Sequence, residues 1–350
     1  MFDKTLKQFV KPVYQQLRSS LIVNRNLDWR TAIFISSGAR TGSTWVSQLV
    51  NYRNEYRFLY EPFFIRPLGF PALQQFLPDK RIQYLRPNND DRKLISQAEY
   101  ILSGRFRHPH VDQYNTKFVC ARRLVKEVQS NLWVKWLKTH FPSLPIILLL
   151  RHPIPTIRSR YADYFRVPPS YRGDVDVDPG RRRSRYLDLV FGQKDLVDDH
   201  LASMRSQLES ADTVMEQRTV IWCIQNYVPL RQFQRGEIFI TFYENYCIEP
   251  EKEIRRLNAY LGQKIDDSSL SRFLTRLRKP SANSKLKAEM LDGWKMVTSW
   301  QKKATAQDIS QTAAVLKLFG LDAVYSAADP LPNADGAAEL LGRPTPSRMS

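Results

Sequence analysis

The sequence predicts an α/β fold, in which helices cover both faces of a central parallel sheet of about five strands to give three layers. Short apolar runs rich in β-branched or aromatic residues alternate with longer segments of helical periodicity. The runs are too apolar to leave one face in water, which is typical of parallel strands. With 350 residues, of which 43% are hydrophobic, the chain can bury a large core.

Five segments have the composition of buried strands. The four clearest are residues 31–37, 117–123, 145–151 and 237–244, and residues 56–62 form a weaker fifth. Helical patterns lie between them, at residues 44–51, 132–140, 154–165, 219–232 and 250–261. Because parallel strands need long crossover connections, usually helices, this alternation favours parallel pairing.

We expect one domain over residues 30–325, preceded by an N-terminal amphipathic helical segment over residues 1–29. Apolar residues of that segment recur at helical spacing with basic residues between them, so it either packs on the domain or lies on a membrane surface. Residues 166–200 are rich in Pro, Gly, Asp and Arg and predict an insertion or lid. The small, polar residues of 326–350 predict a disordered tail.

The chain is basic, with 53 Lys and Arg against 35 Asp and Glu and a formal charge of +18. Such a charge suits nucleic acid, an anionic membrane or an anionic substrate. No nucleic-acid-binding module is found in the sequence, so we expect no nucleic-acid partner. Three scattered cysteines favour a reducing compartment without a zinc site. Because no secretory signal or membrane span is evident, we expect a cytoplasmic protein, with the N-terminal segment as a candidate contact to the inner membrane face.

The stretch SSGARTGSTW, residues 36–45, follows the first clear strand and opens into a helix. Free N–H groups at the start of a helix make such a loop a phosphate cradle. A Walker A loop carries a lysine before its hydroxyl residue, whereas here Ser43 follows Gly42 directly and Arg40 supplies the charge. The strand over 145–151 ends in Arg151 rather than in an aspartate that could hold magnesium. The sequence therefore predicts a P-loop-like site for an anionic donor, with no metal.

RTGSTW (40–45) together with LLRHPIPTIRSR (149–160) resembles the sulfotransferase family that uses 3′-phosphoadenosine 5′-phosphosulfate (PAPS). The resemblance extends to residues 240–262 and 278–325, and so covers about residues 30–325. It implies a loop that binds the 5′-phosphosulfate through Arg40, Thr41, Gly42, Ser43, Thr44 and Trp45. It implies a second site, Arg151 and Ser159, for the 3′-phosphate.

Three residues qualify the resemblance. His152 stands where the family often has aspartate, and Pro155 could alter the entry into the following helix. Arg40 is similar to the arginine of the carbohydrate-type branch. That similarity implies an acceptor hydroxyl on a glycan, a glycolipid or a small natural product.

The general base that takes the acceptor's proton is expected to be Glu61, which ends the strand after the donor loop and should face the same cleft. The alternative is a structural pair between this carboxylate and Arg57 or Arg66. His108 and His110 are rival bases.

Two further features have two readings each. Trp45 falls on the helix face expected to meet the sheet, so core packing competes with ligand contact. A dense basic run is either a solvated loop or a contact for an acidic acceptor; it comprises Arg181, Arg182, Arg183 and Arg185. At the level of function, the alternatives to a PAPS-dependent enzyme are a P-loop-type nucleotide-dependent kinase and an inactive scaffold with this fold.

Overall fold

The computed structural model describes residues 17–63, 82–128, 130–166, 185–277, 279 and 292–343. At its centre is a five-stranded sheet with the order β3-β5-β2-β6-β7, and all four neighbouring pairs are parallel. Its strands are β2 (Ala32–Ser37), β3 (Tyr56–Tyr60), β5 (Arg122–Val128), β6 (Ile146–Leu150) and β7 (Phe239–Phe242). The expected α/β fold with a parallel five-stranded sheet is confirmed.

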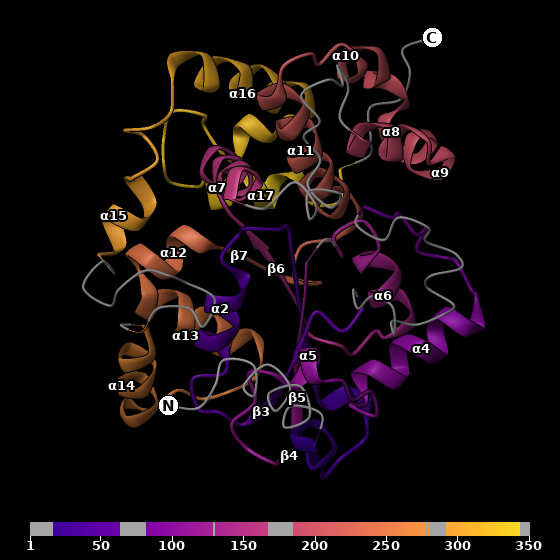
Figure 1. The fold of residues 1–350 in the computed structure, drawn as a ribbon, viewed down its shortest axis with the longest axis vertical. Coiled ribbons are helices and arrows are strands. Elements are labelled where there is room, and N and C mark those ends of the chain that lie inside the picture. Colours follow the sequence, from indigo (N-terminus) through magenta and orange to yellow (C-terminus); the bar gives the residue numbers. More distant parts are fainter. Residues whose placement is uncertain are drawn as a thin grey trace, which may run out of the picture.

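Helices cover both faces of the sheet (Figure 1). One core lies under α2 (Ser43–Val50), α12 (Tyr243–Ile248), α13 (Pro250–Tyr260) and α14 (Asp267–Leu277). The other core lies under α4 (Arg92–Leu102), α6 (Val134–His140), α8 (Arg185–Phe191), α10 (Arg205–Glu209), α11 (Val214–Gln232) and α16 (Ala306–Phe319). The remaining helices are α5 (Pro109–Asp112), α7 (Pro153–Arg166), α9 (Lys194–Leu196), α15 (Gly293–Thr298), α17 (Ala334–Leu340), the π-helix η3 (Val197–Leu201) and the 3₁₀ helices η1 (Trp29–Thr31), η4 (Ala202–Met204) and η6 (Leu321–Ala323). In the described part of the chain, no helix is long and apolar enough to cross a membrane.

Side chains of one strand alternate between the two cores, as the pleat requires. In β2, Ile33 and Ile35 enter the core under α2, and Phe34 enters the core on the opposite face. Every residue of β2 and β6 is buried, which explains why these strands have no polar face in the sequence.

The strand expected at residues 117–123 is displaced along the chain. Only β4 (Val119–Cys120) and the first residues of β5 fall in that range, and β4 pairs with the short strand β1 (Val23–Asn24) outside the main sheet. The sheet strand itself runs to Val128 and contains Arg123, Lys126 and Glu127, all of them buried. Because these charged residues interrupt the apolar pattern, the sequence did not predict the strand beyond residue 123.

The structure corrects part of what was expected of the lid (166–200) and the tail (326–350). Residues 185–200 pack into the core through α8 and η3, while residues 167–184 lie outside the described part. The tail over 326–350 was expected to be disordered, but α17 forms within it and buries Ala337 and Leu340. A Cβ on Gly336 would lie 1.9 Å from the Ala323 carbonyl oxygen, so small residues allow this helix to pack close to the preceding chain. The first 16 residues of the expected N-terminal helix also lie outside the described part, and residues 17–20 are helical.

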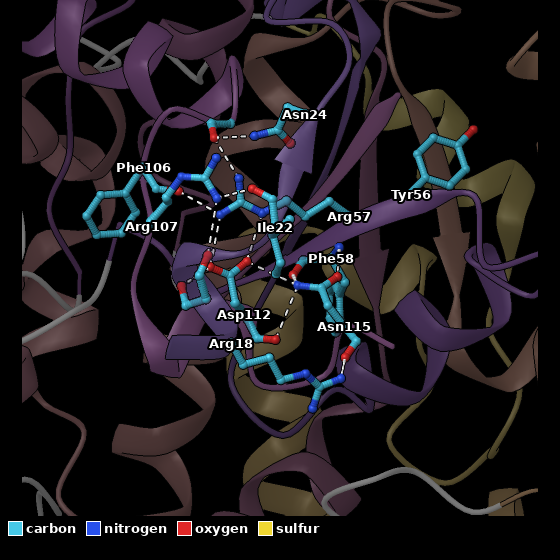
Figure 2. A network of polar contacts seen from close by, with 12 residues as sticks. Arg18, Ile22, Asn24, Tyr56, Arg57, Phe58, Phe106, Arg107, Asp112 and Asn115 are labelled. Carbon is cyan, nitrogen blue, oxygen red and sulfur yellow. Dashed lines mark hydrogen bonds and ion pairs between the residues drawn. The ribbon is translucent and has the colours of Figure 1, made fainter. Parts of the chain in front are cut away.

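A polar network at the amino edge of the sheet holds the N-terminal segment (Figure 2). The buried Arg57 guanidinium binds both oxygens of Asp112, at 2.8 and 2.9 Å, and donates to the carbonyls of Gly104 and Phe106. Arg123 donates to backbone carbonyls of residues 26, 28 and 102, and burial lowers its pKa to about 10. Arg57 is therefore bound by Asp112 and is not the partner of Glu61.

Replacing Asp112 tests this network, because it would leave the Arg57 guanidinium buried without a counter-charge. We expect Asp112→Ala to lower the free energy of unfolding by about 3–5 kcal/mol in urea titrations. Lys194→Ala removes the exposed pair with Asp198 and should cost less than about 1 kcal/mol. Equal, small effects of the two variants would contradict a stabilising role for the buried pair.

Candidate functional site

The loop over residues 38–42 joins the central strand β2 to α2 at the carboxyl edge of the sheet. The neighbours of β2 are β5 on one side and β6 on the other, so the strand order reverses beside this loop. In open parallel sheets, ligands bind outside the carboxyl ends of the strands at such a switch point. The topology thus places the predicted phosphate loop where a ligand crevice is expected.

The loop has the backbone of an anion cradle. Arg40 and Gly42 have φ angles of 68° and 80°, and the Thr41 hydroxyl donates to the Gly38 carbonyl at 3.0 Å. The helix α2 then begins at Ser43, with Gly42 as its N-cap. N–H groups in a first helical turn lack intrahelical acceptors, and the helix dipole favours an anion there. Thr44, in the same turn, is half-buried.

Gly42 lies against the ring of Tyr243, the first residue of α12. A Cβ at Gly42 would lie 2.5 Å from the ring, so only glycine fits without displacing it. The same ring lies 4.2 Å from the Arg151 guanidinium carbon and 5.5 Å from the Trp45 ring. Trp45 itself is buried and donates from Nε1 to the Lys279 carbonyl at 3.3 Å. Trp45 therefore packs in the core. This was the interpretation that competed with ligand contact.

The two sequence motifs meet in space. Arg151, which directly follows β6, donates from Nη1 to the Arg40 carbonyl at 3.1 Å. Arg40 donates from Nε to the Ser159 hydroxyl of α7 at 3.2 Å. Pro155 lies in the first turn of α7, where the missing N–H would have no partner, so the helix is unbroken from Pro153 to Ser159.

Several buried polar atoms around this loop have no hydrogen-bond partner among the described residues. They are Ser37 Oγ, Asn131 Nδ2, Arg151 Nε and Gln225 Nε2. The Gln225 side chain lies beside Gly38, 3.5 Å from the position of a Cβ there. Unpaired buried polar groups are costly, and a ligand rich in acceptor oxygens would satisfy the amide, hydroxyl and guanidinium donors. Gln225 was missed in the sequence because it lies within an apolar helical segment.

Glu61 follows β3 at the same edge of the sheet, with a φ of 47°. Its N–H donates to the Lys126 carbonyl at 2.8 Å, and its carboxylate is ion-paired with the buried Lys126 ammonium. Lys126 Nζ also lies 4.5 Å from the centre of the Tyr60 ring, which in turn lies 5.2 Å from the His110 ring. Glu61 and the rival base His110 are therefore parts of one cluster. Arg66, another considered partner of Glu61, lies outside the described part.

Lys126 and Glu127 were not found from the sequence, because they follow the residues expected to form the strand. Glu127 is buried, and its Oε2 accepts from the Phe63 N–H at 2.8 Å. Burial, with the nearby Glu61 charge, raises the pKa of Glu127 well above its ordinary value. A raised pKa favours the neutral form of this carboxyl, which lies beside the ion pair of Glu61 with Lys126. His108 instead caps α5 by accepting from the His110 N–H.

His152 connects the end of β6 to the C-terminal segment. Its N–H donates to Glu244 Oε1 at 2.9 Å, and its Nε2 lies 3.0 Å from the Ser326 carbonyl oxygen. The ring stacks on Trp300, and burial lowers its pKa to about 4. The other Glu244 oxygen accepts from the Tyr325 hydroxyl at 3.0 Å. His152 is thus a neutral structural residue rather than a ligand of the site. The side chains of the arginine run 181–185 lie outside the described part.

Comparisons with known proteins find matches over most of the chain. The family model described as "Sulfotransferase family" matches residues 32–267. Mouse sulfotransferase SULT7A1 complexed with PAP is 16% identical, with a TM-score of 0.43, over 93% of this chain and 92% of that one. The sulfotransferase domain from the Synechococcus PCC 7002 olefin synthase is 18% identical, with a TM-score of 0.41, over 82% and 94% of the chains. No curated protein matched.

Gly42 offers a first test of the loop. We expect Gly42→Ala to lower the free energy of unfolding by about 1–3 kcal/mol more than Gly236→Ala, because it adds an overpacked contact with Tyr243. The control Gly236 has a similar φ of 83° with nothing near its Cβ position, so it isolates the backbone cost. Urea unfolding measures both variants, and equal losses would mean that Tyr243 moves aside freely.

His152 predicts a pH dependence of stability. Between pH 6.5 and about 4 the unfolded chain binds a proton at this residue and the folded chain does not, so stability falls as the pH falls. Relative to His152→Phe, which keeps a stacking ring but cannot titrate, the native chain should lose about 3 kcal/mol more over this range. The measurement is the unfolding free energy in urea at several pH values, and parallel curves for the two proteins would refute the assignment.

Proposed function

Because the chain belongs to the sulfotransferase family, we propose that it transfers a sulfuryl group from PAPS to a hydroxyl group of an acceptor. The observation that carries the proposal is the contact of Arg151 with the Arg40 carbonyl, together with the contact of Arg40 with Ser159. PAPS carries negative charge at two places, the 5′-phosphosulfate and the 3′-phosphate. Two adjoining cationic sites, brought together from segments 111 residues apart, suit such a molecule.

In this proposal the loop and the second site divide the donor between them. The backbone N–H groups and hydroxyls of residues 40–45 hold the 5′-phosphosulfate, with Arg40 as the cation. Arg151 and Ser159 hold the 3′-phosphate. The unpaired donors of Ser37 and Gln225 supply further hydrogen bonds beside the loop. Arginines and backbone dipoles then balance the donor's charge, so the proposal requires no metal ion.

Glu61 is proposed as the general base. Sulfuryl transfer requires an acceptor oxygen in line with the sulfur, stabilisation of charge on the leaving oxygen, and removal of the acceptor's proton. The Glu61 carboxylate can accept that proton, and its ion pair with Lys126 fixes its orientation. Arg40 and the loop N–H groups stabilise the leaving group's charge.

The proposed acceptor is a hydroxyl of a glycan, a glycolipid or a small natural product. Aromatic rings gather beside Glu61: Tyr60 makes edge contacts with His110 and with Tyr114 at 5.2 and 5.0 Å. Such rings can pack against the apolar face of a sugar or of another ring. The excess of basic residues also favours an anionic acceptor.

Calorimetric titration with 3′-phosphoadenosine 5′-phosphate, the unreactive product of the donor, tests the proposal together with transfer of labelled sulfate to a panel of hydroxyl acceptors. Arg151→Ala should lose most of the binding, at a cost of about 2–5 kcal/mol for an unpaired anion. Glu61→Gln should bind 3′-phosphoadenosine 5′-phosphate like the native chain and lose about 10²–10⁴-fold in kcat.

Glu55→Gln is the matched control for the second variant, since this exposed glutamate lies just before the same strand. It should change neither binding nor turnover. Preferential binding of ATP with magnesium would instead support a nucleotide-dependent kinase, and no binding of either nucleotide would support an inactive scaffold.

A further inference from the structure

Exposed apolar side chains gather at the amino edge of the sheet, in what we call the apolar corner. Its members are Leu17, Leu21, Val23, Leu27, Phe118 and Val119, each between 44% and 62% exposed. They make up six of the eleven large apolar residues that are exposed in the described part of the chain, and the other five belong to five separate segments. Concentrated exposure of this kind, unlike scattered exposure, marks an interaction site.

Backbone contacts join members of the corner that lie far apart in the sequence. Leu17 and Leu21 are one helical turn apart, with the Leu21 N–H donating to the Leu17 carbonyl at 3.2 Å. Val23 lies directly opposite Val119 in the β1–β4 pair, and its N–H donates to the Phe118 carbonyl at 2.6 Å. The corner is therefore built from two chain segments that are hydrogen-bonded to each other.

The corner cannot bury itself by rotating, because the opposite side of the same segment is fixed (Figure 2). The buried Ser19 hydroxyl donates to Asp112 at 2.6 Å, and the Asn24 amide donates to the Gly104 carbonyl at 2.8 Å. Arg18 donates to the Asn115 carbonyl, and Arg107 donates to the Ser19 carbonyl at 3.1 Å. Ser19 and Asn24 are thus held against the protein, while Leu17 and Leu21 stay exposed beside them. The two leucines are therefore available to an apolar partner outside the domain.

Basic residues flank the corner. Arg25, Lys117 and Arg122 are exposed, and no hydrogen bond or ion pair of their side chains is found among the described residues. The Arg25 N–H donates to the Cys120 carbonyl at 2.9 Å, which places this arginine beside the β1–β4 pair. A symmetric contact between two copies of the chain would add the same cations from the second copy and supply no counter-charge from this patch. An anionic surface would instead pair with them.

We propose that the apolar corner inserts into the surface of an anionic lipid bilayer. Apolar side chains enter the boundary between headgroups and acyl chains, and the flanking cations bind anionic headgroups. The corner lies at the amino edge of the sheet, whereas the phosphate loop lies at the carboxyl edge. The seven residues of β5 separate the two edges by roughly 20 Å at about 3.3 Å per residue. Membrane binding therefore leaves the donor loop open and is independent of the proposed transfer activity.

Flotation of the full chain with vesicles tests the proposal. Binding should be strong to phosphatidylcholine vesicles that contain phosphatidylglycerol, weak to phosphatidylcholine alone, and reduced by salt. The variant Leu21→Ser/Val23→Thr/Val119→Thr should lose at least about tenfold in partitioning, because each methylene withdrawn from the bilayer weakens binding. The variant Arg25→Gln/Lys117→Gln/Arg122→Gln should lose about fivefold for each cation removed.

The control variant Val214→Thr/Leu318→Ser changes exposed apolar residues elsewhere and should bind vesicles like the native chain. Titration with 3′-phosphoadenosine 5′-phosphate should be unchanged in every variant, which separates this proposal from the proposed function. If the apolar variant is unfolded, vesicle binding by the charge variant tests the proposal by itself.

Three results would overturn the proposal. One is native binding by both the apolar and the charge variant. Another is vesicle binding that is lost on Phe2→Ser/Leu6→Ser/Phe9→Ser and kept in the apolar variant. The last is a native dimer in light scattering that becomes a monomer in the apolar variant and does not bind vesicles.

Discussion

The position of the Arg151 side chain determines the arrangement of the candidate site. Its backbone carbonyl accepts from Trp222 Nε1 at 3.1 Å, its guanidinium packs on Tyr243, and its Nη1 binds the Arg40 carbonyl. Three separate parts of the chain, α11, α12 and the phosphate loop, are thereby fixed around one cation at the end of β6. A half-buried arginine gains from an anion or several oxygens that offset its desolvation. The structure supplies an aromatic face and one carbonyl, and its Nε is left for a ligand.

The buried charged residues of β5 hold other parts of the chain at both edges of the sheet. Near the amino end of the strand, Arg123 binds the carbonyls of residues 26 and 28. Near the carboxyl end, Lys126 is ion-paired with Glu61. One strand thus ties the chain's first described residues to the sheet and positions the proposed base at the opposite edge. In an apolar interior such groups are tolerated only when nearly every donor is bound, which explains the many carbonyl acceptors around the arginines.

The sequence was informative where local chemistry and pattern agree. The apolar run before the loop predicted the central strand β2, and Gly42 with Arg151 led to the proposed phosphate loop and second site. The sequence was uninformative where contacts between distant segments determine the environment of a residue. Lys126 and Glu127 look like surface residues until β3 brings Glu61 beside them, and Gln225 looks like an ordinary helix residue until Gly38 packs next to it. The small residues of α17 indicate disorder unless their close packing on η6 is known.

The hydrogen bond between His152 and Ser326 joins residues 174 positions apart. Together with Tyr325 and Glu244, it makes the end of β6 depend on a segment near the C-terminus. During synthesis the phosphate loop, Arg151 and Ser159 all leave the ribosome long before that segment exists. Domains are completed in chain order, and contacts of long sequence separation form late. The nascent chain therefore holds all the proposed donor-binding residues before the contacts with residues 325 and 326 can form. The candidate site is completed only when this last part of the domain is released.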